Sequence, residues 1–160
     1  MSDHTAWMPV DIRAAAPDDL EPIAAVDAAA WREHYAPHVP PEVAEAWLAR
    51  IPYTWRRSFR EGRTDFVVRV AATDGAVIGF VAVERARLWS LQVDPAFDDR
   101  GIAEALFADA RELCGPGLFV HSLAANRRAS AFWNAQGLRV VAEMKDVFLD
   151  AEIPTLIYAF

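Results

Sequence analysis

Hydrophobic and polar residues follow helical spacing through most of the first third of the chain, after one short stretch in which they alternate. The alternating residues 10–14 predict a strand, and the helical spacing that follows predicts a helix that ends near Tyr35. A proline pair at 40–41 begins a second predicted helix, and Pro52 begins a third that ends at Gly62. This part of the chain is therefore predicted to be one strand followed by helices.

Apolar and β-branched residues dominate from residue 66 onward, and short turns interrupt them. Asp74-Gly75 is a hairpin turn between the apolar stretches 66–71 and 77–83. A third stretch, 88–93, ends at an Asp-Pro pair. Three consecutive strands with short connections predict an antiparallel meander.

The remaining residues alternate between helical and extended patterns, with glycines at several boundaries. They predict a helix from about 101 to 114, a strand at 118–122, a helix at 126–136 and two final strands near 138–149 and 155–160. No internal repeat or linker occurs, so residues 1–160 are expected to form one domain. The predicted fold class is α/β of the α+β kind, with a mixed, mostly antiparallel sheet of about seven strands flanked by helices.

Composition and charge exclude several classes of protein. With 54% hydrophobic and 24% charged residues, the chain is expected to be a folded globule. It has no apolar run near the ~20 residues that span a bilayer, and its start does not resemble a signal peptide. We therefore expect a cytoplasmic protein with no membrane partner. The formal charge of −7 argues against nucleic acid as a partner, because binding to phosphate backbones needs a basic face.

Two residue counts add to this picture. The single cysteine, Cys114, excludes an intrachain disulfide, and no Cys/His spacing typical of structural zinc occurs, so no metal is expected. Lys145 is the only lysine among 16 basic residues, and alanine is abundant. We interpret this composition as that of a GC-rich bacterial genome.

Two stretches carry the strongest motifs. Residues 91–106 read LQVDPAFDDRGIAEAL, in which a strand and a V-x-P turn lead to a loop whose Gly101 and Ala103 open a helix. Residues 126–138 read NRRASAFWNAQGL. Together with the element order, which covers nearly the whole chain, these stretches resemble the GCN5-related N-acetyltransferase (GNAT) superfamily. The resemblance implies a GNAT fold, acetyl-CoA as co-substrate, and transfer of an acetyl group to a small-molecule or peptide amine by direct attack.

The first stretch, by this resemblance, holds the coenzyme. Small residues at the start of a helix let backbone amides and the positive end of the helix approach a diphosphate. The preceding strand offers its backbone to the pantetheine arm, and an amide near Val93 is the expected donor to the thioester oxygen. The residues expected to contact the coenzyme are Leu91, Gln92, Val93, Asp98, Asp99, Arg100, Gly101, Ile102, Ala103, Asn126, Phe132 and Trp133.

Three positions depart from the family's pattern. Asp98 stands where the family has Gln or Arg, and Asp99 often replaces a glycine. These carboxylates either repel the diphosphate or cap the helix and point to water, with Arg100 keeping positive charge on the loop. Trp133 stands where many members carry a tyrosine that protonates the departing thiolate. An indole is not an acid, so Trp133 either slows the reaction or is simply a core aromatic.

His121 is the candidate general base. It precedes Asn126 by five residues, the offset at which protein N-terminal acetyltransferases of the family carry a glutamate base. A histidine at that place can accept a proton from the attacking amine, directly or through water. The alternative is a hydrogen-bonded histidine of the core.

The acceptor site is expected near the first helix and the hairpin. Trp31 and Tyr35 are one helical turn apart, with His34 beside them, and they either form an aromatic floor for an amine or pack an amphipathic helix. Glu84, at the end of the hairpin's second strand, is either a second base or a solvated carboxylate. Arg127 and Arg128 either reach coenzyme phosphates or are surface charges.

Two functions follow from these expectations. The first is an N-acetyltransferase in which His121 and the Val93 amide are the catalytic groups. The second is a GNAT-fold binding or regulatory module that has lost the reaction, which the acidic loop and Trp133 favour. An unpaired edge strand at the C-terminus suggests a homodimer.

Overall fold

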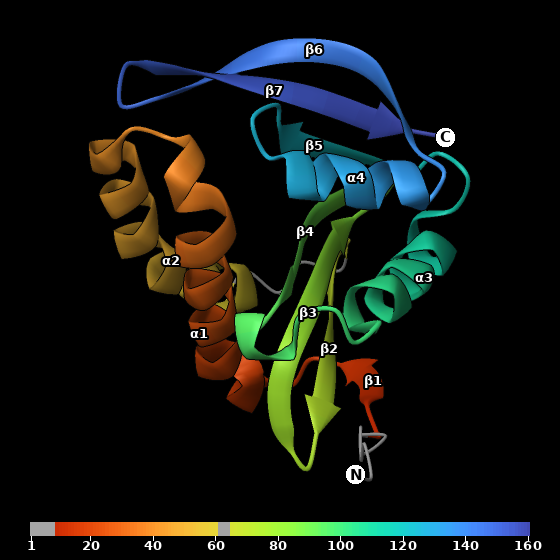
Figure 1. Cartoon of the computed structure of the whole chain (residues 1–160). Helices are drawn as coiled ribbons and strands as arrows, with labels where there is room; N and C mark the ends of the chain where they lie inside the picture. Colours follow the sequence, from red (N-terminus) through yellow and green to blue (C-terminus); the bar gives the residue numbers. More distant parts are fainter. Residues whose placement is uncertain (1–8, 61–64) are drawn as a thin grey trace, which may run out of the picture.

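The computed structural model describes residues 9–60 and 65–160, and these residues form one sheet with helices on both faces (Figure 1). The strands are β1 (Asp11–Ala14), β2 (Phe66–Thr73), β3 (Ala76–Glu84), β4 (Arg87–Val93), β5 (Phe119–Leu123), β6 (Arg139–Phe148) and β7 (Ala151–Ala159). Their order is β1-β2-β3-β4-β5-β7-β6, and only β4 and β5 are parallel neighbours. The predicted α/β class, with a mixed, mostly antiparallel sheet, is confirmed.

Helices in the described part of the chain pack on the two faces of this sheet. They are α1 (Leu20–Ala30), α2 (Pro41–Arg60), α3 (Ile102–Cys114) and α4 (Arg127–Ala135). A wider π-helical turn, Trp31–Tyr35, follows α1 directly, so the helical path continues to Tyr35 as predicted. Helices α1 and α2 lie on one face of the sheet, whereas α3 and α4 lie on the other (Figure 1). Their hydrophobic side chains pack in two separate clusters.

The structure differs from the sequence prediction at Pro52, which lies inside α2 instead of starting a separate helix. A proline within a helix removes one backbone donor and costs about 3 kcal/mol. Ile51 and Trp55, on either side of it, are 3% and 5% exposed and pack in the core with α1 and β3. This packing offsets the cost, so the helix continues. The predicted helix end at Gly62 lies outside the described residues.

The predicted meander of three antiparallel strands is confirmed. Asp74 and Gly75 have φ angles of 49° and 79°, the left-handed values of a tight two-residue hairpin turn between β2 and β3. β3 and β4 pair with one irregularity, because Leu88 lies opposite Val83 and Ser90 lies opposite Ala82. Trp89 is therefore an extra residue on β4, and such a bulge bends a strand.

β4 and β5 start as parallel neighbours and then separate. They pair only at Arg87 with Phe119 and at Leu88 with Val120. β5 continues along β7 as far as Leu123, whereas β4 continues along β3. In the described part of the chain, β4 therefore has one unpaired edge from Trp89 onward.

The two C-terminal strands close the other end of the sheet. β7 lies between β5 and β6, so β6 is the edge strand there and is exposed along nearly all of its length. This differs from an edge at the very C-terminus, and homodimer formation stays a prediction.

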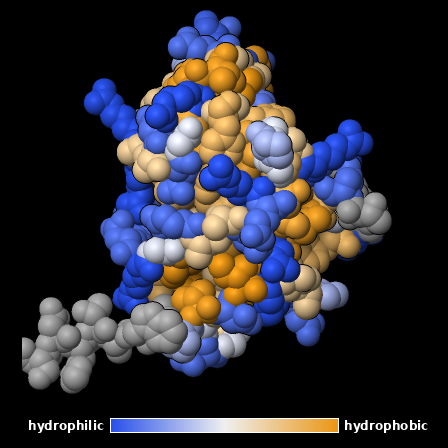
Figure 2. Space-filling model, turned by 90° about the vertical axis from the view of Figure 1, so that its right-hand side faces the viewer, coloured by the Kyte–Doolittle hydropathy of each residue, from blue (hydrophilic) through white to orange (hydrophobic). Residues whose placement is uncertain are grey.

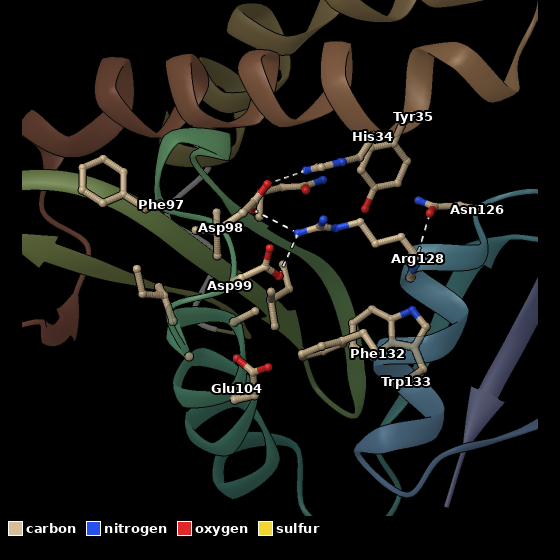
Figure 3. A pocket seen from close by; sticks show the side chains of 17 residues that line it. His34, Tyr35, Phe97, Asp98, Asp99, Glu104, Asn126, Arg128, Phe132 and Trp133 are labelled. Atoms are coloured by element: carbon tan, nitrogen blue, oxygen red, sulfur yellow. Dashed lines mark hydrogen bonds and ion pairs between the residues drawn. The ribbon is translucent and has the colours of Figure 1, made fainter. Parts of the chain in front are cut away.

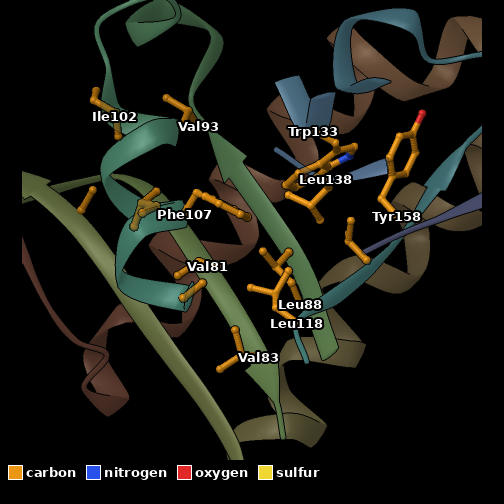
Figure 4. Close-up of a cluster of buried hydrophobic side chains, with 14 of the residues drawn as sticks. Val81, Val83, Leu88, Val93, Ile102, Phe107, Leu118, Trp133, Leu138 and Tyr158 are labelled. Carbon is orange, nitrogen blue, oxygen red and sulfur yellow. The ribbon is translucent and has the colours of Figure 1, made fainter. Parts of the chain in front are cut away.

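Two hydrophobic clusters hold the layers together. The cluster under α3 and α4 joins them to the sheet and includes Val81, Leu88, Leu106, Phe107, Trp133, Leu138 and Tyr158 (Figure 4). The cluster under α1 and α2 includes Ile23, Trp31, Ile51, Trp55 and Phe80. On the outside, hydrophobic areas of the face drawn in Figure 2 are interrupted by hydrophilic side chains. None of the described helices is long and apolar enough to cross a membrane.

Gly79 on β3 allows α3 to pack closely on β3. A Cβ atom at this position would lie 3.1 Å from the Gln92 carbonyl oxygen and 3.2 Å from Leu106 Cδ1. We expect Gly79→Ala to lower the free energy of unfolding by about 1–3 kcal/mol, because the added methyl group pushes α3 or β4 aside. Urea unfolding measures this change.

Gly117→Ala is the matched control, since its added methyl group would lie 3.9 Å from its nearest neighbour, Ala86 Cβ. Its free energy of unfolding should stay within about 0.5 kcal/mol of the wild type. Equal stability of Gly79→Ala and the wild type would contradict the close packing of α3.

Candidate functional site

The unpaired edge of β4 carries backbone groups that face away from β3. The amide of Asp94, directly after β4, donates to the carbonyl of Ile78 on β3 at 2.8 Å, so the backbone of Asp94 faces β3. Peptide groups alternate in direction along an antiparallel pair, and Gly79 lies opposite Val93. The peptide groups of Val93 and Leu91 therefore point to the other side, where β5 has separated.

A cavity of 260 Å³ lies beside this edge and is called the smaller cavity below (Figure 3). Its walls come from β4, the loop before α3, the start of α3, one side of α4 and the π-helical turn. The structure brings together in this lining every residue expected to contact the coenzyme except Arg100. Arg100 is exposed, and its guanidinium lies 5.3 Å from the centre of the Phe97 ring.

The start of α3 presents free backbone donors to the smaller cavity. Gly101 precedes the helix with a φ of 77°, and no side chain caps the helix. Ile102 and Ala103, the first helical residues, line the cavity. Uncapped amides at a helix start carry partial positive charge and suit an anion. Asp99 also has a left-handed φ, 61°, which is more often taken by glycine.

The two loop carboxylates differ in their surroundings. Asp98 Oδ2 lies 3.1 Å from His34 Nε2, and its Oδ1 lies 3.3 Å from Arg128 Nη2 (Figure 3). The Asp98 side chain is 19% exposed, whereas that of Asp99 is 89% exposed and lies 3.9 Å from Arg128. The alternative in which both aspartates cap the helix is wrong, because no side chain caps α3. Asp98 instead joins the π-helical turn to α4, and Asp99 points to solvent.

The wall formed by α4 is largely buried. Asn126 is 2% exposed, and its side-chain oxygen accepts a hydrogen bond from the Ala129 amide, which caps the helix. Trp133 is 6% exposed and packs against Phe132 and Phe107. The Trp133 Nε1 atom is buried and has no hydrogen-bond partner among the described residues. It is therefore a donor available to a bound molecule.

A second cavity of 640 Å³, called the larger cavity below, lies beyond β4 on the side of α1 and α2. Four residues line both cavities: Tyr35, Leu91, Gln92 and Trp133. The two cavities therefore meet at the middle of the unpaired β4 edge. Burial raises the pKa of Tyr35, and a hydrogen bond with the Gln92 side chain opposes the rise.

A stack of aromatic rings forms one wall of the larger cavity. Trp31 lies between Tyr35, at 5.3 Å, and Trp47, at 5.0 Å, and the Trp47 ring meets the edge of Phe148. Of the residues expected at the acceptor site, Trp31 and Tyr35 line this cavity. His34 lines the smaller cavity instead.

Glu84 lies in neither lining, and its carboxylate accepts a hydrogen bond from Trp89 Nε1 at 2.8 Å.

His121 lies on β5 and lines the larger cavity. Burial lowers its pKa below the ordinary value, and the positive charge of Arg87 lowers it further, whereas Asp146 raises it. A lowered pKa keeps the imidazole neutral near pH 7, which is the form that accepts a proton.

Asp27 is a site residue that the sequence analysis did not single out. It lines the larger cavity, and its Oδ2 accepts a hydrogen bond from Trp55 Nε1 at 2.8 Å. Burial raises its pKa to about 6, and the bond from Trp55 opposes the rise. In the sequence, Asp27 is an acidic residue at a position that has the helical spacing of the buried apolar residues of α1.

Comparisons with known proteins show the family of the chain. A family described as the acetyltransferase (GNAT) domain matches residues 10–143. No protein with a curated description matches the sequence.

Solved structures share the fold. A GCN5-related N-acetyltransferase from Rhodopseudomonas palustris has a TM-score of 0.79 and 20% identity over 94% of this chain and 95% of that one. The PaiA N-acetyltransferase of Thermoplasma acidophilum, solved in complex with coenzyme A, has a TM-score of 0.74 and 21% identity over 92% and 98% of the two chains. An acetyltransferase of the GNAT family from Bacillus cereus has a TM-score of 0.66 and 19% identity over 94% and 95%.

Among the described residues, no group of three or more His, Cys, Asp or Glu side chains is arranged to hold a metal ion.

Asp27 should destabilise the fold at neutral pH. Its folded-state pKa of about 6 lies above the ordinary 3.8, so the folded state favours the protonated form. The contribution of this raised pKa to the free energy of unfolding is present below pH 4 and is lost as the pH rises through about 6. Asp27→Asn, which keeps an acceptor for Trp55, should therefore raise the free energy of unfolding at pH 7.5 by about 1–3 kcal/mol.

The same variant should leave stability at pH 4 within about 0.5 kcal/mol of the wild type, because the Asp27 carboxyl of the folded state is then protonated and neutral, as the amide is. Urea unfolding at the two pH values gives the comparison. A variant that is equally stabilised at both pH values would contradict burial of the charge as the cause.

Proposed function

The chain belongs to the GNAT acetyltransferase family and is an acyltransferase, and we propose that it moves the acetyl group of acetyl-CoA to a small amine by direct attack. The observation that carries the proposal is the junction of the two cavities. One cavity suits a coenzyme, the other suits an acceptor, and they meet at an unpaired strand edge that can hold a thioester.

The coenzyme would lie in the smaller cavity. Its diphosphate would accept hydrogen bonds from the amides at the start of α3, where Gly101 and Ala103 leave room for it. Its pantetheine arm would run along β4 and pair with the peptide groups of Leu91 and Val93 as a missing strand would. The arm then ends at the junction of the cavities.

Arg128 would compensate the acidic loop. Its guanidinium contacts Asp98, and the Arg128 side chain is 54% exposed, so the group retains donors for a phosphate oxygen. Asp98 also contacts His34, and Asp99 points to solvent. The charge next to the α3 amides is therefore smaller than two isolated aspartates imply.

The acceptor amine would enter through the larger cavity. The buried Asp27 carboxylate attracts an ammonium group, and the neutral His121 imidazole accepts its proton directly or through water. The free amine then attacks the acetyl carbonyl carbon, forming the C–N bond. The Val93 or Leu91 amide stabilises the oxyanion.

Breaking the C–S bond leaves a thiolate, and Tyr35 is the side chain we propose as its proton donor. The chain has three tyrosines. The Tyr158 hydroxyl donates to Ser130 Oγ at 2.8 Å. Tyr53 lines the larger cavity but not the smaller one. Tyr35 lines both cavities, and its raised pKa keeps it protonated. The proton that Tyr35 gives up is replaced from solvent or from His121, so no covalent enzyme intermediate is needed.

Replacing Arg128 tests the coenzyme site. We expect Arg128→Gln to raise the dissociation constant of coenzyme A about 5- to 30-fold, because a charged donor is lost and Asp98 keeps its charge. Arg127→Gln is the control, since Arg127 is exposed and does not line the cavity. Isothermal titration calorimetry measures both variants. An equal rise in the dissociation constant of coenzyme A for both variants would contradict the role of Arg128.

Two substitutions test the proton steps. His121→Gln should lower kcat about 10²- to 10⁴-fold at pH 7.5, and its rate should keep rising with pH where the wild type levels off. Tyr35→Phe should lower kcat about 10²-fold with the KM for acetyl-CoA little changed. Tyr53→Phe, on the larger cavity alone and 66% exposed, is the control for Tyr35.

Release of free coenzyme A in the presence of an amine panel is the measurement. A binding or regulatory module would release none. Wild-type turnover that Tyr35→Phe and His121→Gln leave unchanged would contradict the assigned proton transfers.

A further inference from the structure

Arg87, the first residue of β4, lines the larger cavity with a guanidinium group on which the carboxylates of Asp146 and Glu84 act only at longer range. Its Nε atom is buried without a hydrogen-bond partner, and it forms no ion pair with the described residues. The nearest carboxylates have other donors. Glu84 accepts from Trp89 Nε1 at 2.8 Å, and Asp146 accepts from Thr155 Oγ1 at 3.1 Å. A cation in these surroundings lacks the partner that buried charges normally have.

The surroundings of Arg87 fix which part of its guanidinium is available. The Trp89 ring lies under one face, with the guanidinium carbon 3.7 Å from the ring centre. A guanidinium stacked in this way keeps its edge of N–H donors, which matches the two oxygens of a carboxylate. Burial lowers the pKa of Arg87, whereas Asp146 and Glu84 raise it, and the group stays charged.

The other arginines of the larger cavity do not offer the same site. Arg50 is exposed and lies over the Phe148 ring at 5.0 Å. Arg57 already takes part in another interaction. Arg87 is therefore the arginine of this cavity that most needs an anion.

The distance from Arg87 to the cavity junction limits the size of the anionic molecule. Arg87 and Leu91 are four residues apart on β4, or about 13 Å between Cα atoms along a regular strand. The bulge at Trp89 and the reach of the Arg87 side chain over the Trp89 ring shorten the span that a ligand has to cover. An α-amino acid carries its amine and carboxylate on one carbon and does not bridge such a distance. A molecule with its amine at the junction and its anion at Arg87 has to be elongated.

One wall of the larger cavity is aromatic. The rings of Tyr35, Trp31, Trp47 and Phe148 follow one another along it, and the cavity volume is 640 Å³. Such a wall suits an aromatic or aliphatic group rather than a polar one.

We propose, building on the acetyl transfer proposed above, that the acceptor is an elongated apolar amine that ends in a carboxylate, and that Arg87 binds this carboxylate. A short peptide with an apolar first residue and a free C-terminus has this chemistry, as does a long ω-amino acid. Arg87 then acts on binding and on the choice of acceptor, while the amine end reacts at the cavity junction.

The test compares acids with their uncharged amides. Phenylalanylglycine, phenylalanylglycylglycine and 8-aminooctanoate are each offered beside the corresponding primary amide, and release of coenzyme A is followed. The wild type should use the best acid with a kcat/KM at least 10-fold above that of its amide. In Arg87→Gln this ratio should fall to about 1, through a higher KM for the acid and an unchanged KM for the amide.

Arg50→Gln is the matched control and should keep the preference for the acid. If Arg87→Gln does not fold, the ratio of acid to amide in the wild type still decides, because it needs no substitution. Equal use of acids and amides by the wild type overturns the carboxylate proposal and leaves acetyl transfer intact. 2-Phenylethylamine, which has no anion, tests the transfer alone, and failure to acetylate it or any of the six compounds counts against acetyl transfer itself.

Discussion

The separation of β4 from β5 is the constraint on which the rest of the site depends. The two strands share only two pairs of residues before the bulge at Trp89 turns β4 away. Beyond that point the peptide groups of Leu91 and Val93 have no strand beside them, although such groups are almost always paired in folded proteins. A ligand with an extended amide-containing arm satisfies them. Both cavities lie where β4 and β5 have separated, and they meet there because they share lining residues on β4.

Charges at the site are arranged for binding at some cost to stability. Burial raises the pKa of Asp27, and the Nε atom of Arg87 is buried without a hydrogen-bond partner among the described residues. Neither arrangement stabilises the folded protein when no ligand is bound. Asp98 shows the opposite case, since Arg128 compensates this carboxylate beside helix amides that suit an anion, and His34 lies within hydrogen-bond distance of it. Unpaired charges in one cavity and a compensated charge in the other are consistent with an ammonium-bearing acceptor and an anionic coenzyme.

Much of the fold can be read from local signals in the sequence. The Asp74-Gly75 turn and the helix that follows Gly101 lie where the sequence predicts them, because each depends on backbone conformations that few residues adopt. Pro52 misleads for the opposite reason. Its local penalty is real, but the burial of Ile51 and Trp55 comes from distant segments that no local pattern reveals.

The candidate site divides in the same way. The coenzyme residues lie in consecutive motifs, so nearly all of them line one cavity. The acceptor residues come from separate elements. His34 and Tyr35 are neighbours, yet the π-helical turn directs only Tyr35 into both cavities. The unmet charge of Arg87 is visible only once its surroundings are known.

The amides of Gly101, Ile102 and Ala103 provide the most direct measurement of whether this helix start holds a diphosphate beside an acidic loop. ¹⁵N-resolved NMR spectra should be recorded during titration with coenzyme A and, separately, with pantetheine, which lacks the diphosphate. Coenzyme A should shift these three signals together with those of Leu91 and Val93, whereas pantetheine should shift only the β4 signals. Binding of coenzyme A that leaves the three amides unchanged would contradict the account.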